Sequence, residues 1–300
     1  LIDMAHLGPR AFEEIGGEVV QTTAFVLGAH HIKGYKGSYA RLIEPTTQQG
    51  KEELFLSGTH RYAAQQDNFS KIPGAPVAYW VSEKTIKVFM NKTKISKIGN
   101  ALQGTISGDN SRFLRLWYET SVTNSAFLDF SKEVKWFPHS KGGEFRKWYG
   151  NRDYLINWKN DGYEIRNFVD KKGSLRSRPQ NTTNFFKQGI TWSDLTSGNF
   201  SARYLPKGST FDATGPTIPV SDVRSLERLL GYMNSKIFQT LLDITCPGLH
   251  YNNGVISDLP LISVREVPMI CDNVQANIAL SQKDWDSFET SWDFKKHPMI

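Results

Sequence analysis

The stretch Leu114-Arg115-Leu116-Trp117-Tyr118 is a short run of mostly apolar and aromatic residues, and two runs of the same kind follow it. They are Tyr154-Leu155-Ile156-Asn157-Trp158 and residues 200–204, with glycines between the runs. Short runs of this composition between turn residues indicate strands, and Asp161-Gly162 is a typical turn pair. Because the strands do not alternate regularly with helices, the sequence predicts an α+β fold rather than a doubly wound parallel sheet.

Two helices are expected beside these strands. The first covers residues 76–90, because a proline suits the first helical position and one face would carry Val77, Trp80, Val81, Lys84 and Val88. The second carries an apolar stripe at three- and four-residue spacing, formed by Leu226, Leu229, Leu230, Met233, Ile237, Phe238 and Leu241. Such a stripe is usually part of the core rather than a cofactor site.

The first 43 residues predict a short helix followed by a hairpin. The helix would cover residues 9–15, with a proline near its first turn and Gly16-Gly17 at its end. The β-branched run over residues 18–27 indicates a strand, and residues 39–43 would return beside it after a glycine-containing turn. The other strands of that sheet are expected outside this chain. Residues 44–70 are polar, which predicts a linker and a domain boundary near Pro45.

The composition argues against several classes of protein. The chain has 300 residues, of which 39% are hydrophobic and 22% are charged, and this is enough to bury a core. It has no apolar run of about 18 residues and no signal-peptide pattern, so a cytoplasmic protein without a membrane partner is expected. The two cysteines, Cys246 and Cys271, provide neither a disulfide framework nor a zinc site. Both ends of the sequence look cut, which predicts a fragment of a longer protein.

The positive charge is concentrated in one part of the chain. The net charge is +6, and residues 132–178 contain 12 Lys and Arg against 6 Asp and Glu, which accounts for the whole excess because the remainder has 24 of each sign. Positive charge gathered in one segment raises the local potential toward polyanions. The alternative interpretation is a solvated, lysine-rich face.

Three segments are candidates for binding a nucleic acid. In residues 103–117, small residues and glycines form a loop that would let a phosphate backbone come close, and arginines follow it. In residues 135–152, cations alternate with aromatic residues around Gly142-Gly143, a composition suited to phosphates and bases. Residues 176–184 offer arginines for guanine edges and amides for adenine edges. Each segment also fits a plain alternative, namely a turn, a loop with inward-packed aromatics, or a polar surface loop.

Catalytic and metal sites are not indicated. His30-His31 lacks the spacing and the acidic or thiol companions of a metal site. The carboxylates Asp284, Asp286, Glu289 and Asp293 are interpreted as solvated helix charge. The sequence has no Gly-x-Ser-x-Gly elbow and no convincing cysteine–histidine pair.

Several longer motifs recur in one known family. They are LGPRAFEEIGGEVVQTTAF at residues 7–25, YARL at 39–42, FSKIPG at 69–74, PVAYW at 76–80, SGDN at 107–110, KGGEFRKWYG at 141–150, GITWS at 189–193 and WDSFETSWDF at 285–294. With these motifs the sequence resembles the adenine-specific DNA methyltransferases of type 1 bacteriophage-exclusion (BREX) systems. These enzymes are related to the single-chain type II (type IIG) restriction-modification enzymes. The resemblance spans nearly the whole chain.

The resemblance implies a division into functional domains. Residues 1–44 would be the C-terminal tail of a Rossmann-like methyltransferase domain, residues 45–265 a mixed α/β DNA target recognition domain, and residues 266–300 the start of a further region. The intact protein would use S-adenosylmethionine to methylate adenine in double-stranded DNA, and other proteins of the defence system would be possible partners. The glycine-rich cofactor loop and the Asn-Pro-Pro-Tyr tetrad of the family do not occur in these 300 residues. No catalytic, cofactor-binding or metal-binding residue is therefore assigned, and the chain alone is expected to be inactive.

The resemblance also implies a role for the basic segments, because a base must be flipped out of the duplex for methylation and the DNA must be gripped meanwhile. The predicted DNA-binding residues are Gly108, Asp109, Asn110, Arg112, Arg115, Lys141, Gly142, Gly143, Arg146, Lys147, Trp148, Arg178 and Asn181. The glycines would permit close backbone approach. The loop from Gly248 to Gly254, which follows the second helix, is a further candidate for facing DNA.

Two other functions remain open from the sequence. One is a non-catalytic specificity subunit of a restriction-modification system, against which the catalytic-domain tail at residues 7–44 argues. The other is a carbohydrate-binding module, which has only the eight tryptophans in its favour. Binding to duplex DNA with a steep dependence on salt, rather than to an oligosaccharide, separates these possibilities.

Overall fold

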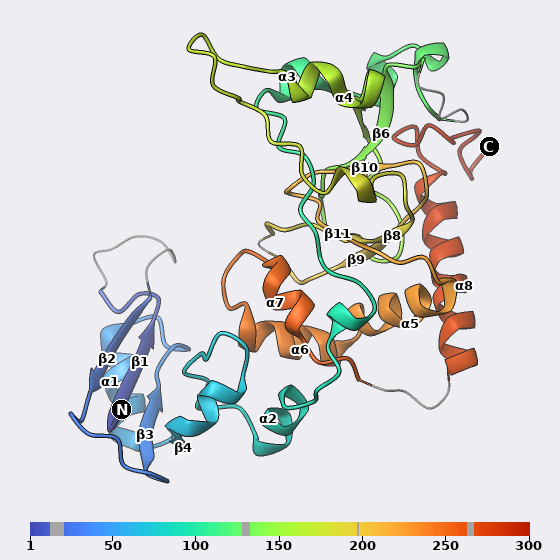
Figure 1. Cartoon of the computed structure of the whole chain (residues 1–300). Helices are drawn as coiled ribbons and strands as arrows, with labels where there is room; N and C mark the ends of the chain where they lie inside the picture. Colours follow the sequence, from blue (N-terminus) through green and yellow to red (C-terminus); the bar gives the residue numbers. More distant parts are fainter. Residues whose placement is uncertain (13–20, 128–132, 197, 263–266) are drawn as a thin grey trace. The chain divides into compact units, whose positions relative to one another are not determined.

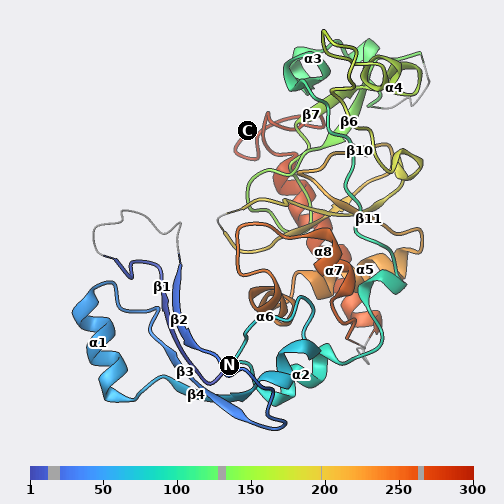
Figure 2. The same cartoon turned by 60° about the vertical axis from the view of Figure 1, so that its left-hand side comes forward.

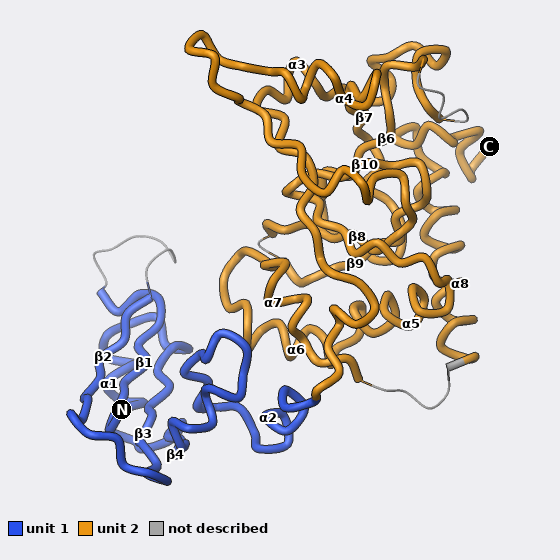
Figure 3. Tube along the Cα trace, in the orientation of Figure 1, with its two compact units in different colours: residues 1–91 blue, residues 92–300 orange. Residues whose placement is uncertain are grey.

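The structure is a computed structural model that describes residues 1–12, 21–127, 133–196, 198–262 and 267–300. The chain divides into two compact units, Leu1–Asn91 (unit 1) and Lys92–Ile300 (unit 2), which Figure 3 colours separately. The boundaries implied by the resemblance, after residues 44 and 265, lie elsewhere. They concern functional domains of a longer protein and stay predictions.

Unit 1 contains a four-stranded sheet in the order β2-β1-β3-β4 (Figure 1, Figure 2). Its strands are β1 (Asp3–Gly8), β2 (Thr22–Val26), β3 (Lys36–Arg41) and β4 (Arg61–Gln65). β1 pairs antiparallel with β2 and parallel with β3, and β3 pairs antiparallel with β4. The strand predicted within residues 18–27 is confirmed for β2. The predicted pairing of β2 with residues 39–43 is wrong, because β1 lies between β2 and β3. The expectation that the other strands of the sheet lie outside this chain is also wrong, because all four strands belong to this chain.

Residues 44–70 form regular structure rather than the predicted linker. Thr47 caps α1 (Gln48–Ser57) by accepting a hydrogen bond from the backbone N of Gly50. The buried side chain of α1 is Lys51, whose Nζ donates to two backbone carbonyl oxygens at 2.7 and 2.8 Å. Because α1 is anchored by a lysine rather than by apolar side chains, its sequence has no apolar periodicity. Its polar composition therefore indicated a linker where the structure has a helix.

Of the two helices predicted in unit 1, one is partly present, and the described residues of the other are not helical. After a 3-10 helix at Gln66–Lys71, α2 covers Glu83–Phe89, and Ser82 caps it by accepting from the backbone N of Thr85. The helix predicted over residues 76–90 is therefore right only in its second half. Residues 9–12 form a turn and a bend rather than the start of a helix, and residues 13–15 lie outside the described residues.

Unit 2 contains two further sheets. The first, in the order β10-β6-β7-β5, is made of β5 (Leu114–Leu116), β6 (Trp136–Ser140), β7 (Tyr154–Asn157) and β10 (Thr210–Phe211). The second, in the order β11-β8-β9, is made of β8 (Gly189–Trp192), β9 (Ala202–Leu205) and β11 (Thr217–Pro219). The three predicted strand runs correspond to β5, β7 and β9. The mixed sheets are consistent with the predicted α+β class.

Aromatic side chains fill the core of unit 2 between the first sheet and the segments that cover it. Trp158 lies beside Phe185 with ring centroids 5.0 Å apart, and Phe185 contacts Phe211 at the same distance. Phe113 packs edge-on against Phe168 at 5.1 Å. These contacts fix the short helices α3 (Asn110–Phe113) and α4 (Lys159–Arg166) on the sheet, and Figure 1 shows both helices together at one end of unit 2.

The predicted apolar stripe belongs to two helices rather than one. α5 covers Val223–Met233 and α6 covers Lys236–Thr245, because Asn234 ends the first and Ser235 caps the second by accepting from the backbone N of Phe238. The fold also contains α7 (Asn253–Asp258) and α8 (Val267–Trp285), which packs against α5. Of the four carboxylates interpreted as helix charge, only Asp284 lies in α8, because the helix ends at Trp285. Short 3-10 helices lie at Ile95–Lys97, Trp117–Glu119, Val122–Asn124 and Thr182–Asn184. Within the described ranges, no helix combines the length and apolar character that a membrane span requires.

Candidate nucleic-acid interface

Two of the three predicted segments are joined by backbone hydrogen bonds. The backbone N of Ile106 donates to the carbonyl of Arg178 at 3.1 Å, and the reverse bond measures 2.8 Å. Asn181 Nδ2 donates to the carbonyl of Gln103 at 2.8 Å. The glycine-containing loop at residues 103–110 and the polar loop at residues 176–181 therefore form one continuous surface of unit 2.

Gly108 serves this contact between segments. Its φ of +73° lies in the left-handed region, and a Cβ atom there would be 2.5 Å from the carbonyl oxygen of Arg176. Glycine is thus required at this position for the backbone to pack against the backbone of Arg176. Asp109 caps α3 by accepting from the backbone N of Arg112 at 3.1 Å, and Asn110 Oδ1 accepts from Ser107 Oγ at 2.6 Å. The Gly-Asp-Asn motif builds the turn that carries the following arginine.

Three exposed arginines lie on this surface, and we call Arg112, Arg176 and Arg178 the arginine face. The guanidinium groups of Arg112 and Arg176 lie 5.0 and 5.2 Å from the ring centroid of Phe168. Stacking on a ring holds an arginine in place while its donors stay available. Within the described ranges, no ion pair joins these three arginines to a carboxylate. The face therefore carries uncompensated positive charge.

Arg115 is held differently from the arginine face. Its Nη1 donates to the backbone carbonyls of Ser111 and Leu114, and its guanidinium lies 5.5 Å from the ring centroid of Trp136. Its side chain is partly buried. Arg115 thus ties the end of α3 to the first sheet of unit 2.

The Lys141–Trp148 segment is directed toward the helices of unit 2. Arg146 Nη1 lies 3.5 Å from Asp284 Oδ2, and its guanidinium is 5.0 Å from the ring centroid of Trp285 at the end of α8. Lys147 Nζ donates to the carbonyl of Asn234, the C-cap of α5, at 2.9 Å. Trp148 lines an apolar cavity of about 270 Å³ between α5 and α8. These three side chains join the loop to the helical layer.

Lys141 and the two glycines begin the same segment. Lys141 Nζ lies 5.9 Å from the ring centroid of Tyr154. Gly142 has a φ of +81°, and a Cβ there would be 2.7 Å from the carbonyl of Thr214. Gly143 is exposed, and its carbonyl accepts from Ser193 Oγ at 2.7 Å. The glycines let this loop turn tightly against its neighbours.

A buried arginine that the sequence did not single out supports this loop from beneath. Arg203 on β9 is 1% exposed, and its guanidinium donates to the carbonyl of Arg146 at 3.4 Å and to Ser193 Oγ at 3.3 Å. Burial lowers the pKa of Arg203 to about 10, with Arg146 adding to the effect. In the part of the chain that the structure describes, no carboxylate forms an ion pair with Arg203. Its charge adds to the positive potential behind the loop.

His139 on β6 is fully buried, and its polar contacts are with neighbouring side chains of the fold. Its Nδ1 is 2.8 Å from Thr210 Oγ1, and its Nε2 is 3.9 Å from Asp212 Oδ2. Burial lowers the pKa of His139 to about 4, an effect that the nearby Asp212 carboxylate opposes and Lys141 reinforces. The imidazole is therefore neutral at pH 7.

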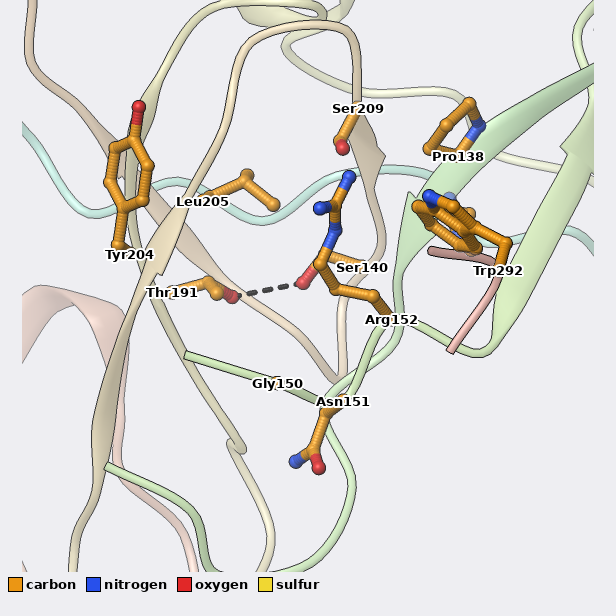
Figure 4. Close-up of a pocket in the computed structure, with 11 residues that line it drawn as sticks. Pro138, Ser140, Gly150, Asn151, Arg152, Thr191, Tyr204, Leu205, Ser209 and Trp292 are labelled. Atoms are coloured by element: carbon orange, nitrogen blue, oxygen red, sulfur yellow. Dashed lines mark hydrogen bonds between the residues drawn. The ribbon is translucent and has the colours of Figure 1, made fainter. Parts of the chain in front are cut away.

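The cavity beside His139 is too small for a ligand. Figure 4 shows its lining, in which Ser140 Oγ and Thr191 Oγ1 share a hydrogen bond of 3.1 Å. The enclosed space is about 10 Å³, about the size of one water molecule. Arg152 closes one side by lying 4.6 Å from the ring centroid of Trp292. The polar groups here belong to packing rather than to a binding site.

Two of the residues set aside as catalytic candidates have local partners. His31 Nε2 lies 2.8 Å from Asp67 Oδ1, and Asp286 Oδ1 accepts from Ser291 Oγ at 2.7 Å. Cys246 and Cys271 are free thiols. Across the described residues there is no group of three His, Cys, Asp or Glu side chains that would hold a metal ion.

Comparison with known proteins gives a full-length match. The chain is 40% identical to the adenine-specific methyltransferase PglX of Lacticaseibacillus casei (strain Zhang) and 38% identical to the adenine-specific methyltransferase BrxX of Escherichia coli O9:H4 (strain HS). Both alignments cover 100% of this chain, but 26% and 24% of the respective relatives. The chain thus spans about a quarter of the length of these proteins. No protein-family model matches it. The resemblance identified from the sequence motifs is confirmed.

Proposed function

We propose that this chain provides DNA target recognition in an adenine-specific DNA methyltransferase of a BREX or related restriction-modification defence system. The support is its full-length similarity to PglX and BrxX, each described as an adenine-specific methyltransferase. The intact protein would transfer a methyl group from S-adenosylmethionine to adenine in double-stranded DNA. Other proteins of the same defence system are proposed partners.

The observation that carries the proposal is the arginine face. Arg112 on α3 and Arg176 and Arg178 on the adjoining loop are exposed and have no carboxylate partner within the described ranges. Arginine donates several hydrogen bonds in a planar arrangement that fits phosphate oxygens and guanine edges. A set of such groups on one surface neutralises several phosphates of a duplex at once and releases their counterions.

The proposal divides the work of methylation between parts of a longer protein. An adenine inside a duplex is reached only after it is flipped out of the stack, which requires a firm grip on the flanking DNA. We assign that grip to unit 2. The assignment of residues 1–44 to the catalytic domain, 45–265 to target recognition and 266–300 to a further region belongs to the same proposal, as do the Rossmann-like fold of the catalytic domain and the lack of activity of this chain alone.

The test removes two charges from the arginine face. For the double variant R112Q/R178Q, we expect weaker binding to duplex DNA on every sequence. The slope of log Kd against log salt should also fall by about 2, since each phosphate contact contributes close to one unit. Kd measured by fluorescence anisotropy on a labelled duplex at several salt concentrations gives both quantities.

The matched control is K236Q, which removes an exposed cation at the start of α6. It should leave the slope within about half a unit of wild type. An R112Q/R178Q protein that binds with the wild-type salt slope would refute the role of the arginine face.

For Lys141, Gly142, Gly143, Arg146, Lys147 and Trp148, contact with DNA stays a prediction. The contacts of Arg146 and Lys147 with α8 and α5 provide a different role, in which these cations hold the fold together. The two roles differ in what a substitution changes. A structural role affects the free energy of unfolding, whereas a phosphate contact affects the dependence of Kd on salt.

A further inference from the structure

A polar groove with many carboxamide side chains lies next to the arginine face on unit 2. Its volume is about 540 Å³. We call it the amide groove, and its lining residues are Ala101, Leu102, Gln103, Gln180, Asn181, Asp194, His250, Asn252 and Asn253. Five of these nine residues are asparagine or glutamine, and none is lysine or arginine. The groove therefore offers hydrogen-bond donors and acceptors rather than positive charge.

The segments that line the groove are fixed by the fold. Leu102 exchanges two backbone hydrogen bonds with Thr217 of β11, at 2.9 and 3.0 Å. The backbone N of Ala101 donates to Ser257 Oγ on α7 at 3.0 Å. On the other wall, Tyr251 N donates to the carbonyl of Asp194 at 2.8 Å. Side chains on such a scaffold keep their positions, which is what sequence-specific hydrogen bonding requires.

Several polar atoms of the lining have no partner within the described part of the chain. Asn253 Oδ1 is buried and accepts no hydrogen bond there. Asn181 uses its Nδ2 on the carbonyl of Gln103, and its Oδ1 has no recorded partner within the same ranges. His250 Nδ1 lies 3.0 Å from Asp194 Oδ2, which orients the ring and directs Nε2 away from that carboxylate. Asn253 Oδ1 is closed to a ligand, whereas Asn181 is exposed, so its Oδ1 can accept a hydrogen bond from a ligand in the groove.

The charge of the lining favours the amino groups of bases over phosphates as ligands. Asp194 contributes a carboxylate to the groove, and a phosphate would be repelled by it. Amino groups of bases, in contrast, donate to carboxylate and carboxamide oxygens. The phosphate contacts lie nearby instead, because Arg178 is three residues from Asn181 on the same loop. Base contacts flanked by phosphate contacts are the arrangement by which a protein reads a sequence.

We propose that the amide groove reads base edges of duplex DNA, and that Gln103 and Asn181 determine a preference for adenine at the positions they contact. A carboxamide pairs with the N6 amino group and N7 of adenine through two hydrogen bonds. This inference rests on the proposed function, since it specifies which part of the DNA-binding surface provides the sequence specificity.

The experiment selects bound sequences from a pool of randomised duplexes with the 300-residue chain, and then compares variants on the selected duplex and on a scrambled one. Gln103 is exposed, so Q103L removes its hydrogen bonds while keeping its size. We expect the ratio of the two Kd values to fall roughly 5- to 150-fold for Q103L. Kd on the scrambled duplex and the salt slope should stay at their wild-type values.

The control is Q282L, at an exposed glutamine of α8 outside the groove, which should keep the wild-type ratio. R112Q should weaken binding to both duplexes while preserving the ratio. The inference is overturned if wild type selects no sequence although it binds with a steep salt dependence, or if Q103L keeps the ratio. A chain that binds no duplex at any salt concentration would instead overturn the proposed function itself.

Discussion

Gly108 and Gly142 show why a glycine-rich motif by itself does not identify a DNA-binding loop. Both occur in motifs that the sequence associates with DNA approach, and in the structure both have positive φ and face a backbone carbonyl of their own chain at a distance that excludes a Cβ. A glycine-rich motif indicates close backbone contact, but the sequence does not say with what. Arg112, which follows Gly108, is exposed on α3, and its contact with DNA stays a prediction.

His139 predicts a specific pH dependence of stability. Its pKa is about 4 in the folded chain against 6.5 for an ordinary histidine, so the unfolded chain binds more protons between these pH values. Its contribution to stability is complete above pH 6.5 and decreases as the pH falls toward 4. Between pH 7 and pH 5 the loss from this residue is about 2 kcal/mol.

Urea denaturation of wild type and of H139N at both pH values tests this effect. The variant lacks the titrating imidazole, so it should lose about 2 kcal/mol less than wild type on acidification. If the two proteins lose the same free energy of unfolding between pH 7 and pH 5, the burial of a neutral His139 is not the source of any acid sensitivity.

At the scale of elements, strands were easier to predict than helices. β5, β7 and β9 lie in short runs that combine apolar and aromatic residues, so the signal for each strand is contained in its own run. α1 and α8 were missed because each buries few apolar side chains. In α8 the buried residues include Cys271, Val274 and Trp285, of which Val274 lies beside Gly231 of α5 and Trp285 lies beside Arg146. The spacing of Cys271 and Val274 is a helical signal, but two positions are too few to decide.

The break between α5 and α6 depends on a cap that the apolar stripe conceals. The stripe continues from Met233 to Ile237, whereas Ser235 caps a new helix in between. Hydrophobic spacing reports which residues face the core, and it does not report where the backbone changes direction. The strand β1 was missed for a related reason, since its partners β2 and β3 are separated from it along the sequence.

Lys147 gives a prediction about the end of α5. Its ammonium group donates to the carbonyl of the C-cap residue Asn234, where the negative end of the helix dipole also favours a cation. K147M should therefore destabilise the chain by about 1 kcal/mol, measured by urea denaturation at pH 7. K236M, at the start of the next helix, is the control and should have less than half that effect. A K147M protein of wild-type stability with a reduced salt slope for DNA binding would instead assign Lys147 to a phosphate.

For the whole chain, the comparison with known proteins and the side-chain contacts of the structure support different conclusions. The match to PglX and BrxX over the full chain identifies the relatives, of which it covers about a quarter. The sequence predicted the α+β class and the basic region, because both depend on composition and local pattern. It did not predict the separation of the cations into an exposed arginine face and a loop bound to α5 and α8, since that depends on contacts such as Lys147 with Asn234 and Arg112 with Phe168.

Hydrogen–deuterium exchange of the chain with and without duplex DNA tests whether the arginine face binds DNA. We expect protection on binding in residues 103–116 and 168–181, which carry the arginine face and one wall of the amide groove. We expect no direct protection in α8, which packs against α5. Protection confined to α8 and to unit 1, with residues 103–116 and 168–181 unchanged, would show that the arginine face does not bind DNA.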